Sequence, residues 1–551
     1  MKKLISILLT LTIIASCITL CACSQAVDPV SELAAEASQD KYRNYYEIFV
    51  GSFADSDGDG SGDLQGIIEK LDYLNDGDPN GGDDLGIDGI WLTPIMPSRS
   101  YHKYDVEDYF NIDEKFGTLE DFDELVTECH KRGIKLIIDL VLNHSSSTNP
   151  MFERAVAEIE QNGRPGEYAE YYEIEKYEND PGQGYTPIAD GYYYESNFSV
   201  YMPEWNLSKQ CTRDYFKEVA EFWLKDHDVD GFRLDATRYY SNKHTDGAEF
   251  LKWFYDESVK IKPDVYMVGE NWTANTEIRD MYESGIDSFF AFGFADSTGG
   301  FVNAVRTGRA GNLVSAIEKY EQSTKEVNPN AINSYFLSNH DQKRSANYVK
   351  AAGAAGTKMA AALYMLMPGN SFIYYGEEIG QTQEVEQNND EYKREPMIWD
   401  SKHLPDIVVN DKATADEEHA PYGGVEQQKN DENSILNFYK RIIKIKNQNP
   451  IIARGEISEY TQDDPSLLAY QLSSKDSDDR IVIVHNLNKT ETKTAEVKES
   501  DAQLRGYLVA SNGTDDDGKT HNNQVKLSGN TLTLPPYSTA VILLSGEGSN
   551  D

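Results

Sequence analysis

The sequence contains little cysteine, and most of it lies at one end. Only 5 of the 551 residues are cysteine, and three of these precede residue 24. The remaining two, Cys129 and Cys211, are too few to form a disulfide framework in a chain of this length. Cys129 also falls within a predicted helix. We therefore expect both to be buried free thiols rather than a bridge.

Positive charge is also scarce. The chain has 51 lysine and arginine residues against 93 aspartate and glutamate residues, a formal net charge of −42. So acidic a protein should be repelled by nucleic acid and by anionic membrane surfaces, so we expect neither as a partner. The charge would keep an exported protein soluble, but it does not identify a substrate.

A long hydrophobic run occurs only near the N-terminus. LISILLTLTIIASCITL follows Lys2 and Lys3, as in a secretory signal. The run ends at LCAC (residues 20–23), which resembles the lipobox of bacterial lipoproteins. This resemblance implies a signal peptide at 1–22, a lipid on Cys23 and a polar tether at 23–41. Cys17 also fits a lipobox, but the apolar run continues past it. We expect an exported protein held on the outer face of the cell membrane, or on the cell surface, by its lipid alone.

From residue 42 onward, short apolar segments alternate with amphipathic helical patterns. One such helix should begin at Thr118, with Asp121 three residues later, and another should bury Phe216, Val219 and Trp223. Eight strand–helix units predict an α/β fold, a parallel (β/α)8 TIM barrel with its active site at the C-terminal strand ends. The strand candidates are YYEIFVGSF, DGIWLTPI, KLIIDLVLNH, DGFRLDAT, VYMVGENW, SFFAFGFA, SYFLSNHD and SFIYYGEE.

Three of these segments are apolar runs that stop at a carboxylate: Asp235 in GFRLDAT, Glu270 in VYMVGEN and Asp341 in FLSNHD. A buried parallel strand that delivers one polar side chain to the barrel rim has this pattern. Together with DLVLNH (residues 139–144), they resemble in order and spacing the four signature segments of the α-amylase family of glycoside hydrolases. The resemblance covers roughly residues 42–545 and implies a carbohydrate-cleaving enzyme.

The family's domain plan accounts for two regions that interrupt the alternation. Residues 145–206 are polar and tyrosine-rich, without a clean helical period, and stand where the family inserts its small domain B after the third strand. From residue 453 the pattern changes to short β-type runs, which implies a C-terminal antiparallel β-sandwich at 453–551. The barrel is then expected in two parts, 42–144 and 207–452.

The resemblance also assigns the chemistry. Retaining hydrolysis needs a nucleophilic carboxylate and a second carboxyl that acts first as an acid and then as a base. By resemblance, Asp235 is the nucleophile, Glu270 the acid/base and Asp341 a third carboxylate that steadies the transition state. Arg233 lies two residues before Asp235 and points the same way along a strand, where its charge would keep Asp235 ionised.

Further residues match the family's sugar-binding positions. His144 and His340 resemble the pair that bonds hydroxyls beside the cleaved bond, and Tyr104 resembles the tyrosine that stacks on the same sugar. Asp105 and Arg344 match the pair with which α-glucosidases clamp a non-reducing end, although some α-amylases carry both.

The segment DSDGDGSGDL (residues 55–64) resembles a short calcium loop found after the first strand in some family members. Its aspartates alternate with glycine, so that oxygen atoms converge on a hard cation through a tight turn. A bound Ca²⁺ would stabilise the fold without taking part in the reaction. A second, interdomain calcium would use Asn143, but Arg238 and Tyr239 depart from that pattern. The expected ligands of the loop are Asp55, Asp57, Asp59, Asp63 and the backbone carbonyl of Ser61.

Shorter sequence features bear on which glycosidic bond is cleaved. Ala236 after the nucleophile favours α-1,4 bonds, and MPEWNLS (residues 202–208) resembles a family segment intermediate between oligo-1,6-glucosidases and neopullulanases. The tyrosine-rich stretch 167–195 and Trp205 should offer stacking surface for a long glucan. We therefore expect a monomeric α-amylase that cleaves internal α-1,4 bonds of starch and maltooligosaccharides. The alternatives are an exo-acting α-glucosidase, a cyclomaltodextrinase or neopullulanase, and a non-catalytic sugar-binding lipoprotein, although all three catalytic acids are present.

Overall fold

The computed structural model describes residue 35 and residues 38–241, 244–384, 389–499, 502–514 and 519–545. The predicted signal peptide and Cys23 lie outside these residues. Within the described part of the chain, no helix is long and apolar enough to cross a membrane. Cys129 is buried, Cys211 is partly exposed, and both are free.

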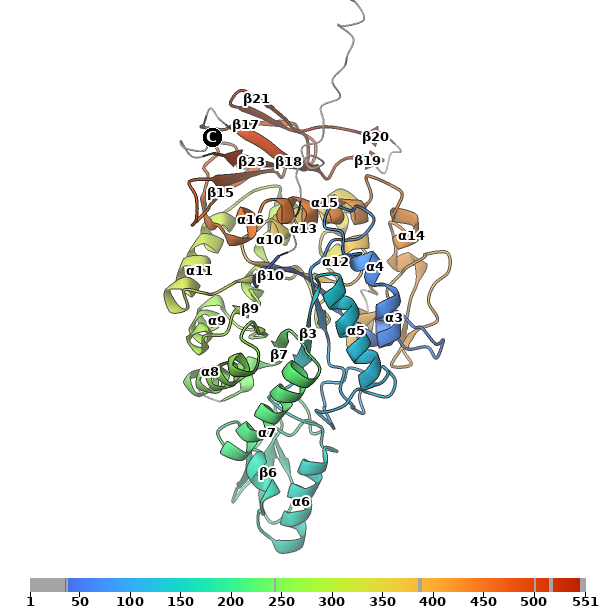
Figure 1. Cartoon of the computed structure of the whole chain (residues 1–551), viewed down its shortest axis with the longest axis vertical. Helices are drawn as coiled ribbons and strands as arrows, with labels where there is room; N and C mark the ends of the chain where they lie inside the picture. Colours follow the sequence, from blue (N-terminus) through green and yellow to red (C-terminus); the bar gives the residue numbers. More distant parts are fainter. Residues whose placement is uncertain are drawn as a thin grey trace, which may run out of the picture.

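Eight parallel strands form a nearly closed barrel, which confirms the predicted fold class (Figure 1). A parallel bridge between Phe290 and Ser334 joins the two edge strands. The first strand is shorter than predicted, because Val50–Phe53 form a helical turn, α2. In sheet order the strands are β10 (Ser334–Phe336), β11 (Asn370–Tyr374), β1 (Asn44–Ile48), β2 (Gly89–Leu92), β3 (Lys135–Leu140), β7 (Gly231–Leu234), β8 (Tyr266–Gly269) and β9 (Ser288–Phe289).

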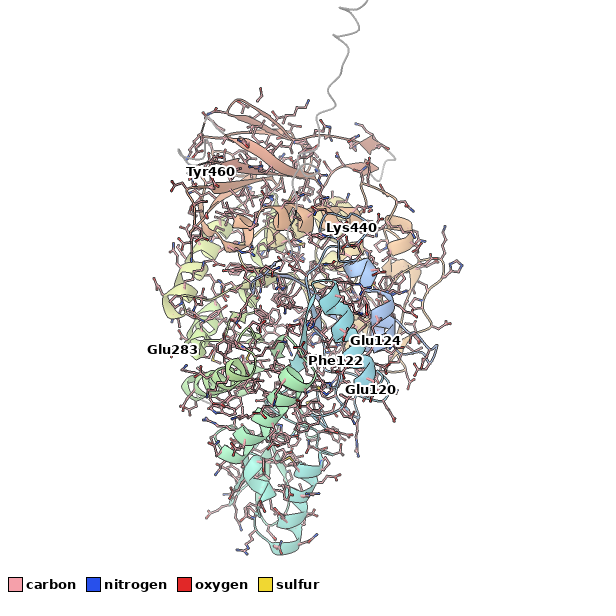
Figure 2. All side chains as sticks on the ribbon, in the orientation of Figure 1. Glu120, Phe122, Glu124, Glu283, Lys440 and Tyr460 are labelled. Atoms are coloured by element: carbon pink, nitrogen blue, oxygen red, sulfur yellow. The ribbon has the colours of Figure 1, made fainter. Side chains whose placement is uncertain are left out.

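Amphipathic helices surround the barrel. In α5, Thr118 is the N-cap as predicted, and it forms a capping box with Asp121. Phe122 is buried, and Glu120 and Glu124 face solvent (Figure 2). The principal helices are α3 (Leu64–Glu69), α5 (Leu119–Lys131), α7 (Gln210–Glu221), α8 (His244–Ile261), α9 (Asn275–Met281), α10 (Gly300–Thr307), α11 (Leu313–Val327), α13 (Gly353–Met365) and α15 (Ile435–Gln448).

The chain after β3 forms a small lobe at one end of the barrel (Figure 1). It contains a three-stranded antiparallel sheet of β4 (Ile174–Lys176), β5 (Tyr185–Pro187) and β6 (Tyr192–Glu195). It also contains a helix, α6 (Pro150–Asn162), although the segment shows no clean helical period in the sequence. Asn149 caps this helix and Pro150 occupies its first turn, which are local signals that the polar composition obscured.

Antiparallel sheets pack at the opposite end of the barrel (Figure 1). The central strand β16 contributes alternate side chains to two cores, with Ile481 and Ile483 in the core shared with the barrel and Val482 and Val484 in the core of this domain. The five-stranded sheet comprises β14 (Glu456–Glu459), β15 (Leu467–Ser473), β16 (Arg480–Asn486), β23 (Ser538–Leu544) and β18 (Gln503–Val509). A second sheet comprises β17 (Lys493–Glu496), β22 (Thr531–Leu534) and β21 (Lys526–Ser528).

Candidate active site

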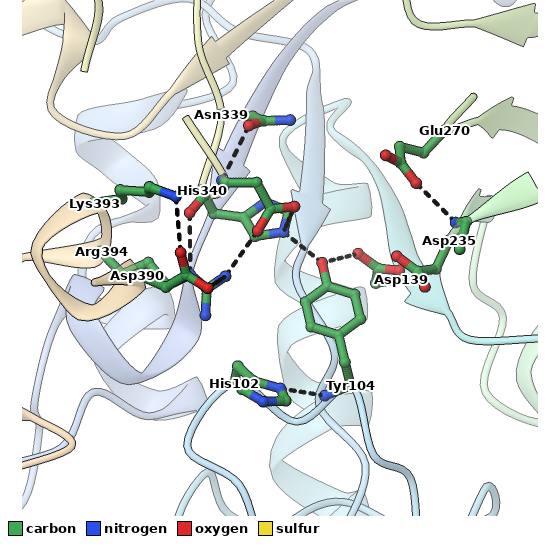
Figure 3. Close-up of polar contacts among 12 residues, drawn as sticks. His102, Tyr104, Asp139, Asp235, Glu270, Asn339, His340, Asp390, Lys393 and Arg394 are labelled. Carbon is green, nitrogen blue, oxygen red and sulfur yellow. Dashed lines mark hydrogen bonds and ion pairs between the residues drawn. The ribbon is translucent and has the colours of Figure 1, made fainter. Parts of the chain in front are cut away.

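The three predicted catalytic carboxylates gather at the C-terminal end of the barrel, where Asp235 and Asp341 both act on the charge of Glu270. Figure 3 shows Asp235 and Glu270 in this group. Asp235 directly follows β7, Glu270 directly follows β8, and Asp341 lies in the loop after β10. Neighbouring parallel strands end at the same rim, so segments far apart in the sequence present their side chains together.

Arg233 is the central cation of the site. Its guanidinium is buried and donates hydrogen bonds to Asp235 at 2.7 Å and to both oxygens of Asp139 at 2.9 Å. It also lies 3.8 Å from Glu270. The predicted pairing of Arg233 with Asp235 is therefore present, and Asp139 helps to hold this arginine in place.

Glu270 is set up to carry a proton near neutral pH. Burial raises its pKa to about 7; Arg233 opposes this rise, and the nearby carboxylates of Asp235 and Asp341 add to it. The backbone N–H of Ala236 donates to Glu270 at 2.8 Å. Ala236 adopts a left-handed backbone conformation (φ 50°), so the residue after Asp235 is strained into the position that orients Glu270.

Asp341 is paired with two cationic groups. His340 Nε2 lies 3.1 Å from one of its oxygens, and the Arg394 guanidinium lies 2.8 Å from the other. Burial opposes ionisation, but His340 and Arg394 together hold the pKa of Asp341 well below its usual range. Asp341 is therefore ionised throughout the neutral range.

His340 is the most enclosed member of the site. Burial lowers its pKa, but Asp341 and Glu47 outweigh burial and raise the pKa to about 9. Its Nδ1 lies 2.5 Å from Glu47 on β1, and its Nε2 lies 2.6 Å from the hydroxyl of Tyr104. A protonated ring would hold Glu47 and Asp341 together by charge.

Tyr104 faces the same space. Its ring stacks against His340 at a centroid distance of 5.6 Å, and its hydroxyl donates to Asp139 at 3.0 Å. His102 lies next to it, where its Nδ1 accepts the Tyr104 backbone N–H (Figure 3).

His144 and Asp105 are both buried beside this group. His144 follows β3, and its Nε2 has no hydrogen-bond partner among the described residues. Asp105 accepts a hydrogen bond of 2.6 Å from Ser98, and Ser100 also donates to it. Asp105 lies close enough to His144 to raise its pKa, although burial lowers that pKa overall.

No hydrogen bond or ion pair joins Arg344 to Asp105 among the described residues. Arg344 is buried, and it donates to the carbonyls of Tyr375 at 2.6 Å and Glu395 at 3.0 Å. Its guanidinium packs over the rings of Tyr374 and Tyr375. Two of its nitrogens thus hold backbone beneath the site, and Nε has no hydrogen-bond partner among the described residues. The role of Arg344 in substrate binding stays a prediction.

The prediction that Trp205 offers stacking surface was wrong. Trp205 is 2% exposed, stacks on Tyr172 at 4.3 Å and donates to the hydroxyl of Tyr109. It forms the core that joins the inserted lobe to the barrel. Residues at other positions expose large aromatic side chains near the site, namely Phe198, Tyr201, Tyr239 and Trp272.

One of these exposed aromatics contacts a site residue directly. Phe198 contacts His144 at a ring-centroid distance of 5.1 Å and Tyr239 at 4.8 Å. Trp272, two residues after Glu270, stacks on Phe292 at 5.0 Å. Flat apolar faces that remain open to solvent are suited to the apolar faces of sugars.

The acidic loop at residues 55–63 forms a candidate cation site away from the carboxylates. Asp55, Asp57 and Asp63 each place one oxygen within 4.8 Å of the others. Asp59 lies outside this group and accepts the backbone N–H of Ser61 at 2.8 Å. Three of the four predicted carboxylate ligands thus converge, and their hard oxygens suit a divalent cation.

A known family of proteins matches most of this chain. The family model described as "Alpha amylase, catalytic domain" matches residues 47–455. The chain belongs to the α-amylase family. It is thus a glycoside hydrolase of that family, whose substrates are starch and maltooligosaccharides.

Relatives within the family differ in their named activities. "Alpha-amylase 3" of Dictyoglomus thermophilum is 35% identical over 87% of this chain and 88% of its own length. Oligo-1,6-glucosidase of Bacillus cereus is 27% identical over 87% and 95%. Among solved structures, Eubacterium rectale Amy13B has a TM-score of 0.83 at 36% identity and covers 94% of this chain and 98% of its own. These relatives are consistent with the predicted intermediate group.

Arg394 and Glu47 are the functional residues that sequence reasoning missed. Arg394 lies in the long loop after β11, and Glu47 lies inside a strand that otherwise reads as barrel core. A charged residue within an apolar strand was a usable signal for Glu47. Nothing local marked Arg394.

Proposed function

We propose that this protein is an α-amylase, a retaining enzyme that hydrolyses internal α-1,4-glucosidic bonds of starch and maltooligosaccharides. Asp235 acts as the nucleophile, Glu270 as the acid and then the base, and Asp341 as the anion that stabilises the oxocarbenium-like transition state. Two observations support this division: Arg233 donates directly to Asp235, and Glu270, whose pKa is raised to about 7, keeps its proton to about pH 7.

Sugar binding is assigned to the groups that face the three acids. Tyr104 stacks on the sugar that is cleaved, and His144, His340 and Asp105 bond its hydroxyls. His144 Nε2 has no partner among the described residues, which supports its role as a hydroxyl ligand.

The observation that carries internal cleavage is that Arg344 donates to the carbonyls of Tyr375 and Glu395, while no hydrogen bond or ion pair joins it to Asp105 among the described residues. A clamp that closes the cleft behind a single glucose would need these two side chains together. The exposed rings of Phe198 and Tyr239 lie beside His144, where they could contact further sugar units of a longer chain.

Calcium would be held at the acidic loop by Asp55, Asp57 and Asp63. Asp63 also caps α3 by accepting the N–H of Gly66 at 2.6 Å, so a cation there would tie the loop to α3. The cation would supply stability only. We also propose that the enzyme is exported and held at the outer face of the cell membrane by a lipid on Cys23, and that it acts as a monomer.

The experiment that tests internal cleavage is the time course on soluble starch. An internally cleaving enzyme lowers viscosity and iodine colour well before reducing ends accumulate. Release of glucose from the first minutes, with viscosity nearly unchanged, would instead favour an exo-acting α-glucosidase. A preference for cyclic dextrins would favour a cyclomaltodextrinase, which is the second candidate. The cyclomaltodextrinase of Geobacillus thermopakistaniensis is 31% identical over 61% of this chain.

A further inference from the structure

Arg394 reaches Asp341 from the end of a short helical turn. This turn, η9 (Asp390–Arg394), lies in the loop after β11. Besides Asp341, the Arg394 guanidinium donates to the carbonyl of His340 at 3.1 Å and to the hydroxyl of Tyr101 at 2.8 Å. Its contact with Asp341 therefore depends on where η9 is held.

Glu391 ties η9 to a hairpin. Glu391 is 5% exposed, and one of its oxygens accepts hydrogen bonds of 2.6 Å from both Asn410 Nδ2 and Lys412 Nζ. The hairpin consists of β12 (Val408–Val409) and β13 (Ala413–Thr414). Residues 410–412 connect its strands; Asn410 and Asp411 have left-handed φ of 50° and 55°, and the Lys412 N–H closes the turn on the carbonyl of Val409 at 3.0 Å.

The hairpin is itself fixed on its outer side. The backbone N–H of Val408 donates to the carbonyl of Gly60 at 3.1 Å, within the acidic loop. Gly60 is oriented by its own N–H, which donates to Asp55 at 2.9 Å. A continuous set of contacts thus runs from the acidic loop through the hairpin to Glu391.

The residue after Arg394 is held from the other direction. The carbonyl of Glu395 accepts hydrogen bonds from Arg344 at 3.0 Å and from the Tyr375 hydroxyl at 2.7 Å. Arg394 therefore lies between two anchored residues. One anchor comes from the barrel wall beneath the site, and the other comes from the hairpin at its edge.

We propose that Glu391 is a positioning residue for the reaction. Its hydrogen bonds with Lys412 and Asn410 hold Arg394 against Asp341. This inference rests on the proposed glycoside hydrolysis. Glu391 touches neither Asp341 nor the other two acids through any hydrogen bond or ion pair in the described part of the chain, so it acts through Arg394. Loss of its carboxylate would release η9 at one end and let the guanidinium move away from Asp341.

The experiment combines Glu391→Gln with Arg394→Lys and measures kcat and KM for the parent, both single variants and the double variant. Glu391→Gln should lower kcat about tenfold, since displacement of a charged group by part of an ångström costs this much or more. In the Arg394→Lys variant, Glu391→Gln should change kcat by less than about twofold, because the contact of the Arg394 guanidinium with Asp341 is already lost. Equal factors in both backgrounds would overturn the proposal.

Lys412→Met tests the same contact from the exposed side, where folding is not at risk. Lys412 is 48% exposed and lies 2.6 Å from Glu391; Lys429 is 46% exposed and lies 2.6 Å from Glu426, away from the site. Lys429→Met is thus the matched control. We expect Lys412→Met to lower kcat and to shift the acidic limb of the kcat/KM profile to higher pH, because Arg394 moves away from Asp341. Lys429→Met should leave both quantities unchanged. Identical profiles for the two variants would contradict the proposal.

The rates are measured on whichever maltooligosaccharide the parent cleaves. The pattern of products then reports on the proposed function, and the ratio between variants reports on Glu391. If the parent enzyme releases only glucose, the α-amylase assignment is wrong, but the test of Glu391 remains valid.

Discussion

Arg233 donates a hydrogen bond of 2.7 Å to Asp235, the residue two positions after it on the same strand end. Because the guanidinium is 1% exposed, little water screens this pair. The hydrogen bond fixes the Asp235 carboxylate in place, as a nucleophile requires. Asp235 is therefore distinguished from Glu270 by its surroundings rather than by its residue type.

Asp235→Asn should fold normally and lose activity by several orders of magnitude, on the order of what removal of a covalent nucleophile costs. The measurement is kcat on maltooligosaccharides together with the melting temperature. Asp256→Asn, at an exposed position on α8, serves as the control and should leave both unchanged. Activity of Asp235→Asn within about tenfold of the parent would rule out the assigned role.

Activity should fall as the pH rises through about 7, because Glu270 must be protonated to act as an acid and its pKa is raised to about 7. The measurement is kcat/KM against pH from 4 to about 9. Glu270→Gln should remove the basic limb along with nearly all activity. A profile that stays flat to pH 9 would show that another group donates the proton.

Stability should also depend on pH through His340. Its pKa is about 9 in the folded protein against 6.5 for the free side chain, so its contribution is fully present below pH 6.5 and is lost as the pH rises through 9. The free energy of unfolding should fall over this window by on the order of 1–3 kcal/mol. Glu47→Gln should flatten the decline, because it removes a partner 2.5 Å from the ring.

His403→Gln provides the control for that measurement. His403 also pairs with a carboxylate, Asp400, at 2.7 Å, but its side chain is 83% exposed. Water screens such a pair, so the substitution should leave the pH dependence as it is in the parent. If Glu47→Gln and His403→Gln give the same curve as the parent, His340 does not carry the charge proposed here.

Removal of metal should lower the melting temperature, since a cation bound only by the folded protein stabilises it by mass action. Asp55→Asn combined with Asp57→Asn should abolish the difference between chelated and calcium-loaded protein. Asp59→Asn should preserve most of it, because Asp59 lies outside the group of three carboxylates. Metal analysis of the purified parent decides the case in which chelation has no effect.

The sequence predicted the parts of this site that are encoded locally. Asp235, Glu270 and Asp341 each end an apolar run, and strand direction alone brings such ends to one rim. The role of Arg394 could not be predicted from the sequence, because its contact with Asp341 depends on how a long loop without a sequence pattern folds back over the barrel. Arg344 shows the converse, since it lies three residues from Asp341 in the sequence but turns beneath the site.

Trp205 shows why an aromatic residue in a polar segment is ambiguous. A lobe of about sixty residues needs its own core, and the largest side chain available fills it, here against Tyr172 and Tyr109. The large rings left exposed are those of Phe198, Tyr201, Tyr239 and Trp272, which no spacing in the sequence distinguished from the others. Burial within such a lobe is settled by packing that a one-dimensional pattern does not contain.

The most informative substrate is a maltoheptaoside blocked at its non-reducing end. An enzyme that binds a chain end cannot cut it, whereas one that binds a chain interior can. We expect cutting at a rate within about tenfold of the unblocked substrate, because Arg344 donates to the carbonyls of Tyr375 and Glu395. Trp272→Ala should raise KM for both substrates if its exposed face binds sugar, since a stacked aromatic contact is worth about 1 kcal/mol. Isomaltose should be a poor substrate, in keeping with Ala236 after the nucleophile. Rapid cleavage of the unblocked heptaoside beside an intact blocked one would replace the α-amylase assignment with an exo-acting α-glucosidase.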